Sequence, residues 1–264
     1  MDKLDQLINI IKKKQSLIIA FSGGIDSSLV AKSAFDVLKD RAVAITIDSE
    51  VFPEKDLKFA EKIAKEIGIN HRIIHQTKLA SPPFAKNTQD RCFYCKKKEM
   101  DIMEKLAKEY KIKDIAYGVN LSDQNEHRPG ISALKKRGAF FPLQIAGIGK
   151  PDIPKIAEFI GLSNYNMPST TCLASRIPYG TDIDVKKLIL IEQAEDFLFK
   201  SGIHDSRVRV HGDMARIEVG ESEMHIIMSN NNNIVRKFKS LGFKYISLDL
   251  QGYRSGSMDE VLSL

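Results

Sequence analysis

The sequence has only three cysteines and no long hydrophobic run. Because three is an odd number, the disulfide framework that holds small secreted domains together is not expected. No apolar stretch approaches the roughly 20 residues that a membrane-spanning helix needs. Residues 1–5 are polar and lack the pattern of a signal peptide. We therefore expect a cytoplasmic protein that does not insert into a membrane.

There is also no block of five or more like charges and no arginine-rich tail. Nucleic-acid binding is therefore not indicated, although the formal net charge is +6. An excess of basic residues suits a small polyanion such as ATP, but a lysine-rich solvated surface is the commoner cause. With 43% hydrophobic and 28% charged residues over 264 positions, the chain has the composition of a soluble globular protein of one large or two modest domains.

What the sequence does have is a stretch with the composition of a phosphate-binding loop. Residues 17–28 read Leu-Ile-Ile-Ala-Phe-Ser-Gly-Gly-Ile-Asp-Ser-Ser, which predicts a buried strand, a tight turn and the start of a helix. Glycines without a Cβ let backbone N–H groups approach an oxyanion, and serine hydroxyls add donors. The helix N-terminus adds its unpaired N–H groups and the positive end of its dipole. A glycine turn that merely joins strand to helix is the alternative.

This loop is neither a Walker loop nor a dinucleotide fingerprint, because the Lys-Ser/Thr pair and the G-x-G-x-x-G pattern are missing. Ser-Gly-Gly-x-Asp-Ser after the first strand resembles the pyrophosphate loop of the PP-loop ATPases. That family cleaves ATP between the α and β phosphates and transfers AMP to a substrate. The resemblance implies that ATP binds here, with Mg²⁺ near Asp26.

Apolar periodicity predicts an α/β fold, and the resemblance of the phosphate loop implies that it is of the PP-loop type. Strands near 16–21, 42–47, 71–76 and 115–118 alternate with helices near 2–14, 26–38, 54–67 and 96–110, which favours a parallel sheet with helices on both faces. Ligands of such sheets bind beyond the carboxyl ends of the strands. The expected ATP-binding residues there are Ala20, Phe21, Ser22, Gly23, Gly24, Asp26, Ser27, Ser28, Ile47, Ser49, Gly118 and Asn120.

The loop expected after the fourth strand, which contains Asn120–Asp123 and Arg128-Pro129-Gly130, adds two further candidates. In PP-loop proteins this region closes over the nucleotide, so Asp123 and Arg128 are expected at the ribose or the phosphates. Turn chemistry alone accounts for both residues equally well. Farther along, Asp152 is expected to cap a helix over 152–161.

After about residue 182 the pattern changes. A helix over 184–201 precedes two strands, 206–210 and 215–219, joined by a turn, and a helix near 232–241 and a strand over 244–250 follow. We therefore predict a smaller α+β domain. The expected boundaries are 1–170 for a PP-loop ATP-binding domain and 171–264 for a C-terminal substrate domain.

The cysteines suggest an iron–sulfur site. Cys92 and Cys95 lie three apart at a helix start, where the helix N-terminus and the neighbouring Arg91 and Lys96 should lower the pKa of both thiols. With Cys172 they make three ligands, which suits a 4Fe-4S cluster with one open iron, whereas zinc normally takes a fourth Cys or His. A redox pair Cys92–Cys95 with an isolated Cys172 is the alternative. The histidines are scattered, and for His71 and His75 a solvated or core role is favoured.

Three segments together point to one family. The Cys172-Leu-Ala-Ser175-Arg176-Ile-Pro-Tyr-Gly180 segment combines with the phosphate loop and with Arg91-Cys92-x-x-Cys95-Lys96. The third, Arg207-Val-Arg209-Val-His211-Gly-Asp-x-Ala-Arg216-Ile-Glu218-Val, lies in the second domain. From about residue 15 to 255 the chain closely resembles the LarE family. These are ATP-dependent sulfur transferases that build the nickel-pincer nucleotide cofactor of lactate racemase.

The resemblance implies a role for several residues. Asp26, Lys96, Cys172, Ser175 and Arg176 are the expected catalytic group. Arg207 and Arg209, two apart on a strand, share a face and are expected to grip the substrate phosphate. Glu195 and Glu218 match acidic positions of the family, although Glu195 also fits a solvated helix face.

Many LarE members have only the cysteine that matches Cys172, and it gives up its own sulfur. Members with three cysteines at these positions resemble a cluster-bearing branch, in which the open iron is thought to hold an extra sulfide and pass it on. If Cys172 is a cluster ligand, we do not expect it to give up its own sulfur. The implied cofactors are ATP, Mg²⁺ and a 4Fe-4S cluster carrying that sulfide.

The implied reaction starts when a carboxylate of a pyridinium dicarboxylate mononucleotide takes AMP from ATP and pyrophosphate leaves. Sulfide then attacks the mixed anhydride, which gives thiocarboxylate and AMP. Three alternatives stay open: a cluster-dependent tRNA thiolase, another PP-loop synthetase, and a nucleotide or cluster sensor that is not an enzyme. The sequence identifies neither the sulfide donor nor an interface, although PP-loop proteins often form homo-oligomers.

Overall fold

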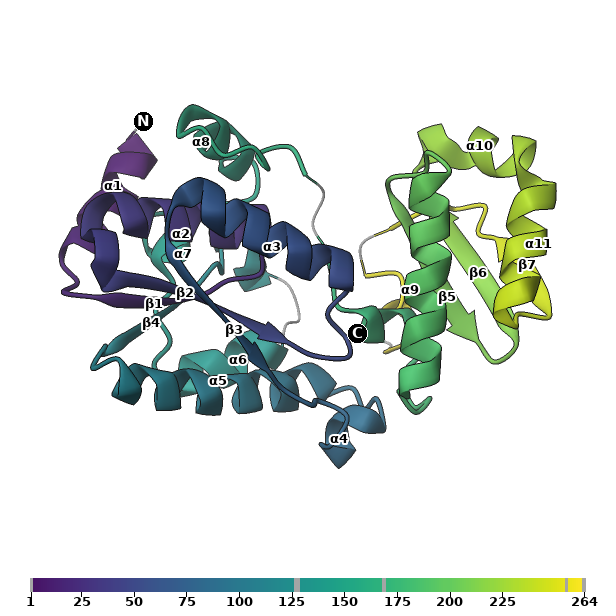
Figure 1. Cartoon of the computed structure of the whole chain (residues 1–264), viewed down its shortest axis with the longest axis horizontal. Coiled ribbons are helices and arrows are strands. Elements are labelled where there is room, and N and C mark those ends of the chain that lie inside the picture. The colour runs from purple at the N-terminus through teal and green to yellow at the C-terminus, as the bar shows by residue number, and fades with distance from the viewer. Residues whose placement is uncertain (1, 126–128, 168–169, 255, 263–264) are drawn as a thin grey trace. The chain divides into compact units, whose positions relative to one another are not determined.

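The computed structural model describes residues 2–125, 129–167, 170–254 and 256–262 (Figure 1). The chain forms two compact units. The first unit consists of Met1–Lys78 and Asp90–Thr170, and the second consists of Leu79–Gln89 and Thr171–Leu264. No helix in the described part of the chain combines the length and apolarity that crossing a bilayer requires.

The first unit is built on a four-stranded parallel sheet. Its strands are β1 (Leu17–Ala20), β2 (Ala42–Asp48), β3 (Asn70–His75) and β4 (Asp114–Tyr117), in the order β3-β2-β1-β4. Ile18 of β1 aligns with Val43 on one side and with Ile115 on the other. The chain thus enters the sheet at its centre and places the end of β1 between the ends of β2 and β4, which confirms the predicted α/β fold.

Helices cover both faces of this sheet (Figure 1). On one face lie α1 (Asp2–Lys12), α2 (Ile25–Leu38), α3 (Glu54–Ile67), α7 (Pro142–Ile145) and α8 (Ile153–Phe159). On the other lie α5 (Arg91–Glu109) and α6 (Pro129–Lys136). Strand β1 is apolar throughout because its residues alternate between two cores: Leu17 and Ile19 pack with α1 and α2, and Ile18 packs with α5.

Two local predictions were wrong. A loop was expected around Pro129 and Gly130, but both belong to α6, which begins at Pro129; proline suits the first helical position because no N–H is needed there. Asp152 is the residue before α8, yet its carboxylate does not cap the helix. It accepts from the backbone N–H of Gly149 at 2.9 Å and pairs with Lys3 at 2.7 Å, so it closes the preceding turn instead.

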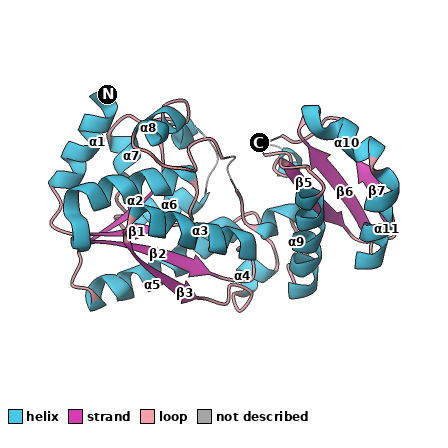
Figure 2. Ribbon diagram, turned by 45° about the horizontal axis from the view of Figure 1, so that its top comes forward, coloured by secondary structure: helices cyan, strands magenta, loops and turns pink. Residues whose placement is uncertain are grey.

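The second unit is a small mixed sheet with helices around it (Figure 2). Strands β5 (Ser206–His211) and β6 (Met214–Val219) are antiparallel, and β7 (Tyr245–Leu248) joins β6 in parallel. The helices are α4 (Pro82–Ala85), α9 (Val185–Lys200), α10 (Met224–Ser229) and α11 (Asn231–Leu241). Short 3-10 turns complete the described chain: Lys39–Arg41, Leu121–Asn125, Leu173–Arg176, Glu221–Glu223 and Glu260–Leu262.

Residues 79–89, which we call the strap, belong to the second unit although the first unit surrounds them in sequence. Asn87, fully buried, donates from Nδ2 to the carbonyl oxygens of Ile177 at 3.0 Å and Pro178 at 2.8 Å. The N–H of Gly180 donates back to the Asn87 carbonyl at 3.0 Å. Phe84 of the strap is also buried. The chain therefore passes between the units three times, and the strap fastens the segment that follows Cys172.

Candidate active site

The phosphate loop, residues 21–24, connects β1 to α2 and depends on two close approaches of backbone. Gly23 has φ +74°, and a Cβ there would lie 2.7 Å from Cα of Ala60 on α3. A Cβ on Gly118, just after β4, would lie 2.8 Å from the backbone nitrogen of Ser27. Only glycine fits either position, so the ends of β1 and β4 and the start of α2 meet at one place.

The serine hydroxyls of the loop are used inside it. Ser27 Oγ donates to the Gly24 carbonyl at 2.9 Å and accepts from the Ser22 N–H at 3.2 Å. Ser28 is fully buried, and its Oγ donates to the Gly23 carbonyl at 3.2 Å. Gly24 is the residue before α2 and has no side chain to cap it. The loop therefore brings backbone and hydroxyl groups to the N-terminus of α2, an arrangement suited to an anion.

Residues after β4 meet the start of α2. Asn120 donates from Nδ2 to Asp26 Oδ1 at 3.0 Å, and its backbone N–H donates to Asp123 Oδ2 at 3.0 Å. The N–H of Ser122 closes the turn on Asn120 Oδ1 at 2.9 Å. Asn120 and Asp123 are both buried. The structure therefore brings Asp26, Asn120 and Asp123 together at one strand end, whereas Arg128 lies outside the described residues.

The end of β2 supports the loop from the other side. Thr46 Oγ1 donates to the carbonyl of Phe21 at 2.8 Å, so the Nε2–H of His71, at 2.8 Å, must donate to Thr46. Burial lowers the pKa of His71, which favours this neutral tautomer. His71 is therefore structural, as expected. Ile47, near the end of β2, is buried, and Ser49 directly follows the strand.

Sequence reasoning missed one residue of this loop. Asn164, 1% exposed, follows α8 and donates from Nδ2 to the Gly23 carbonyl at 2.8 Å and to Ser28 Oγ at 3.0 Å. It lies 141 residues from Gly23 in sequence. No local pattern around Asn164 marks such a contact, so only the folded chain could reveal it.

Lys96 and the cysteines of the first unit lie on α5. Lys96 Nζ is 2.7 and 2.9 Å from the two carboxylate oxygens of Glu99, which is buried. Burial by itself raises the pKa of Glu99, but the charges of Lys96 and Lys78 and hydrogen bonds from Lys96 and Tyr117 outweigh it, so the pKa is lowered. Cys92 is exposed and Cys95 half-buried, one turn apart at the start of the helix.

Cys172 lies in the second unit, in a loop held by Arg176. The guanidinium of Arg176 forms a two-pronged ion pair with Glu195 at 2.9 and 3.0 Å, and both side chains are buried. Its remaining amino group donates to the carbonyls of Thr171 at 2.8 Å and Cys172 at 3.2 Å. Ser175 Oγ also donates to the Cys172 carbonyl at 2.9 Å. Glu195 is thus part of a buried pair and not of a solvated helix face.

Arg207 and Arg209 lie on one face of β5, opposite Glu218 and Arg216 of β6. Arg209 donates to Glu218 at 2.7 Å and to the carbonyl of Ser175 at 3.1 Å. The guanidinium of Arg207 lies 4.6 Å from the ring centre of Tyr253. All three charged partners, Arg207, Arg209 and Glu218, are buried. In this structure the two arginines therefore bind protein groups, and Arg209 supports the loop that carries Cys172.

The three cysteines are divided between the units, with Cys92 and Cys95 in the first and Cys172 in the second, and all are free thiols. Within the described ranges, no group of three or more His, Cys, Asp or Glu side chains is gathered as for a metal ion.

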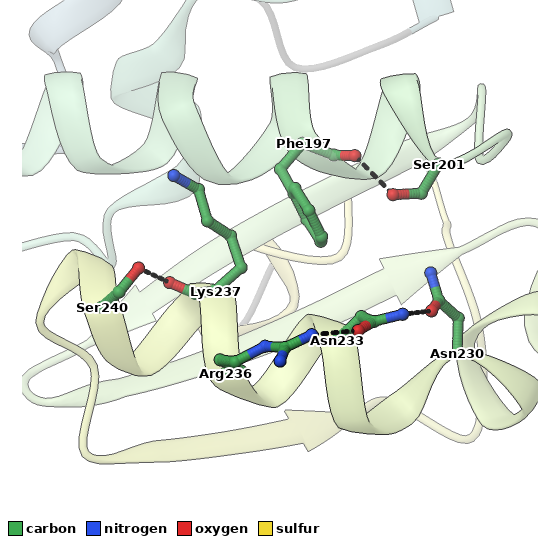
Figure 3. A pocket seen from close by; sticks show the side chains of 7 residues that line it. All are labelled: Phe197, Ser201, Asn230, Asn233, Arg236, Lys237 and Ser240. Carbon is green, nitrogen blue, oxygen red and sulfur yellow. Dashed lines mark hydrogen bonds between the residues drawn. The ribbon is translucent and has the colours of Figure 1, made fainter.

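One hollow of about 400 Å³ lies in the second unit between α9 and α11 (Figure 3). It contains no predicted site residue, and Asn233 bridges Asn230 and Arg236 along its wall. Because no acid, thiol or strand end faces it, we do not place chemistry there. Its lining residues are Phe197, Ser201, Asn230, Asn233, Arg236, Lys237 and Ser240.

Comparison with known proteins decides the family. Residues 2–126 match the NAD synthase family. Over 97% of its length, the chain is 35% identical to the pyridinium-3,5-bisthiocarboxylic acid mononucleotide synthase of Lactiplantibacillus plantarum, of which 94% is covered. The chain belongs to the LarE family. It is accordingly an enzyme of the ATP-dependent synthase and sulfur-transferase class, and the predicted resemblance is confirmed.

Two further relatives are named only as uncharacterised proteins. An uncharacterised protein of Synechocystis is 37% identical over 99% of this chain and 98% of its own length. One of Methanocaldococcus jannaschii is 33% identical over 97% of this chain and 98% of its own length. The similarity to the LarE family therefore spans both units and not the phosphate loop alone.

Proposed function

We propose that this enzyme converts a carboxylate of a pyridinium dicarboxylate mononucleotide into a thiocarboxylate, in the synthesis of the nickel-pincer nucleotide cofactor of lactate racemase. The observation that carries the proposal is the near full-length similarity to the L. plantarum synthase, whose name gives the bisthiocarboxylic acid mononucleotide as its product. The substrate is then a small nucleotide, and nucleic acid and membrane are not partners. A cytoplasmic homo-oligomer is compatible with this chemistry.

The first unit would activate the carboxylate. A carboxylate is a poor acylating group because its leaving group would be oxide, and transfer of AMP to it provides a good one. The phosphates of ATP would lie on the phosphate loop and the first turn of α2, with Mg²⁺ held at Asp26, whose Oδ1 is oriented by Asn120 at 3.0 Å. Catalysis there would come from positioning and from neutralising charge on the departing pyrophosphate.

The second unit would present the sulfur-transfer loop. Arg176 and Ser175 hold the Cys172 carbonyl and so set the direction of the Cys172 side chain. Arg207 and Arg209, which we propose for the substrate phosphate, sit beside this loop through the bond from Arg209 to the Ser175 carbonyl at 3.1 Å. Lys96 would contribute a cation from the first unit, its Nζ oriented by Glu99.

We further propose that Cys92, Cys95 and Cys172 are the ligands of a 4Fe-4S cluster. The donors fit in kind: three thiols outside any disulfide, two of them one turn apart at the start of α5, where the helix dipole favours thiolate. When bound, the cluster would supply the sulfide. If it does not bind, Cys172 would give up its own sulfur, and the source of sulfide outside the protein would be a separate question.

The test is an anaerobic reaction with ATP and the pyridinium dicarboxylate mononucleotide, following pyrophosphate release and the exchange of oxygen for sulfur by mass spectrometry. Acceptor-dependent pyrophosphate with a thiocarboxylate product is expected. No pyrophosphate with any acceptor would make the protein a sensor, and thiolation of tRNA instead would make it a tRNA thiolase. Iron and sulfide analysis separates the two routes of sulfur delivery. Loss of iron in Cys92→Ala supports the cluster. Loss of the mass of one sulfur from Cys172 during turnover supports delivery of the cysteine's own sulfur.

A further inference from the structure

The carbonyl of Gly23 is held on the inner side of the phosphate loop by two donors. Asn164 Nδ2 donates to it at 2.8 Å and Ser28 Oγ at 3.2 Å. Asn164 also donates to Ser28 Oγ at 3.0 Å, so the three groups close a triangle of hydrogen bonds. Asn164 and Ser28 are 1% and 0% exposed, so both side chains are shielded from bulk solvent.

The direction of this carbonyl determines the direction of the next N–H. In a trans peptide, C=O and N–H point to opposite sides, and the chain has no cis peptide bond among its described residues. With the Gly23 oxygen directed inward, the Gly24 N–H is directed outward, where it donates to Ser22 Oγ at 3.3 Å. A peptide between two glycines rotates easily, because neither residue has a Cβ to oppose it. A flip would turn the oxygen toward the phosphates and repel them.

The geometry points to Asn164 as a positioning residue that sets the Gly23–Gly24 peptide for binding of the ATP phosphates. This inference rests on the proposed function for the identity of the ligand. An amide suits the position because its two N–H groups serve the two acceptors, Gly23 O and Ser28 Oγ. An aspartate would place a second acceptor against the same carbonyl.

The turn that carries Asn164 is fixed independently of the loop. Leu162 belongs to the apolar core of the first unit, and Tyr165 packs against it. The backbone N–H of Ser163 donates to Glu66 of α3 at 2.9 Å. Ser163 itself is exposed, and both its backbone N–H and its hydroxyl donate to Glu66 of α3. It therefore offers a matched control next to Asn164 in the same turn.

The experiment measures ATP affinity by calorimetry and the Gly23 carbonyl and Gly24 amide resonances by NMR, for the whole protein and for Asn164→Leu, Asn164→Asp and Ser163→Ala. We expect the dissociation constant of ATP to rise about tenfold in Asn164→Leu, which corresponds to the net contribution of roughly one hydrogen bond. In Asn164→Asp it should rise further. The kcat should change less than the KM for ATP. Ser163→Ala should bind ATP like the natural protein.

Two results would overturn the inference: folded Asn164 variants that bind ATP as tightly as the natural protein, or unchanged Gly23 and Gly24 resonances. If neither Asn164 variant folds, Ser28→Ala removes the other donor, and an unchanged ATP affinity there would count equally against the idea. If the natural protein binds no ATP, the proposed function fails instead. Even in that case, the Gly23 and Gly24 resonances show whether Asn164 determines the orientation of the Gly23–Gly24 peptide.

Discussion

Gly23 and Gly138 have the same backbone angle and different surroundings. Both have φ +74°. A Cβ on Gly23 would lie 2.7 Å from Cα of Ala60, whereas a Cβ on Gly138 would meet nothing within 4 Å. The phosphate loop therefore needs glycine at position 23 for two reasons, the positive φ and the close packing against α3. The turn at Gly138 needs glycine only for the positive φ.

This pair separates the two reasons by experiment. Gly138→Ala should cost only the strain of a left-handed residue, about 1–2 kcal/mol. Gly23→Ala should cost about 1–3 kcal/mol more, because backbone must move away from the new methyl group. Urea unfolding of both variants measures the difference. Equal losses of unfolding free energy would show that α3 moves away from the new methyl group at little cost. Packing against α3 would then not explain the glycine at position 23.

At this scale the sequence predicted residues whose chemistry is local. The Ser-Gly-Gly-x-Asp-Ser pattern placed Asp26 at a helix start, and Asn120 was expected at the end of its strand; the two are hydrogen-bonded at 3.0 Å. Asn164 could not be predicted, because its contact spans 141 positions and an isolated asparagine after a helix normally indicates a turn.

At the scale of elements, two buried arginine–carboxylate pairs connect the Cys172 loop to α9 and to the β5–β6 sheet. Arg176 joins the loop to Glu195 of α9, and Arg209 joins Ser175 to Glu218 of β6. Burying such ions requires full compensation, since a charge left without its partner is costly in a low dielectric. The loop is therefore fixed by the regular elements behind it.

Glu195→Gln should thus be strongly destabilising, by about 3–5 kcal/mol, because the buried charge of Arg176 loses its counter-ion. The double variant Arg176→Met with Glu195→Leu should lose less than the single one, since no charge is then left unpaired. Thermal unfolding and a double-mutant cycle measure both. Additive losses would mean that the two side chains act independently.

The Lys96–Glu99 pair on α5 predicts a dependence on pH. The pKa of Glu99 lies below its usual 4.5 because the charge of Lys96 and its hydrogen bonds outweigh burial. A lowered carboxyl pKa stabilises the fold above pH 4.5, and this contribution is lost as the pH falls through the lowered value. The difference in unfolding free energy between the natural protein and Glu99→Gln should therefore shrink below pH 4.5.

Glu54→Gln is the matched control for this prediction. Glu54 also pairs with a lysine on its own helix, Lys58 at 2.7 Å, but both side chains are exposed. Solvent screens such a pair, so its removal should change stability little at any pH. A Glu99→Gln curve that stays parallel to that of the natural protein as the pH falls well below 4.5 would contradict the assignment.

The elements themselves were mostly predictable. Helix α3 lies where predicted, over 54–67, because its apolar residues recur every three or four positions. Helix α6 was missed because it opens with Pro129-Gly130, which locally signals a turn. The burial of Arg207 and Arg209 on β5 could not be predicted either. Their shared face follows from the two-residue period of a strand. Their contacts with Tyr253 and Glu218 depend on residues that are distant in sequence.

At the scale of the whole molecule, the strap connects distant parts of the sequence. The Ser81-Pro82-Pro83 run looks like a linker, yet Phe84 and Asn87 are buried in the second unit. A single boundary at residue 170, expected from the change of pattern that follows, cannot detect this, because the strap has no periodicity of its own. Its membership follows only from its contacts with residues 177–183.

Asn87→Ala should therefore destabilise the second unit, although residue 87 lies in the first third of the chain. The buried carbonyl of Ile177 loses its donor, at about 1–3 kcal/mol, and the half-buried carbonyl of Pro178 loses the same donor at a smaller cost. Hydrogen exchange should show faster opening in residues 171–183. Thr88→Ala, which alters an exposed hydroxyl of the same strap, is the control. Equal protection in both variants would show that the strap does not support the second unit.

The strap also imposes an order on synthesis. About 80 residues separate Gln89 from Thr171, where the rest of the second unit begins. At ribosomal rates the strap waits roughly 4–16 s before any of its partners leaves the exit tunnel. During that time Phe84 has no core to enter, while β1, β2 and β3, which precede the strap, are already able to pair. Slow codons between residues 90 and 170 would lengthen this exposure, so that stretch of the message is where translation speed should affect the yield of folded protein most.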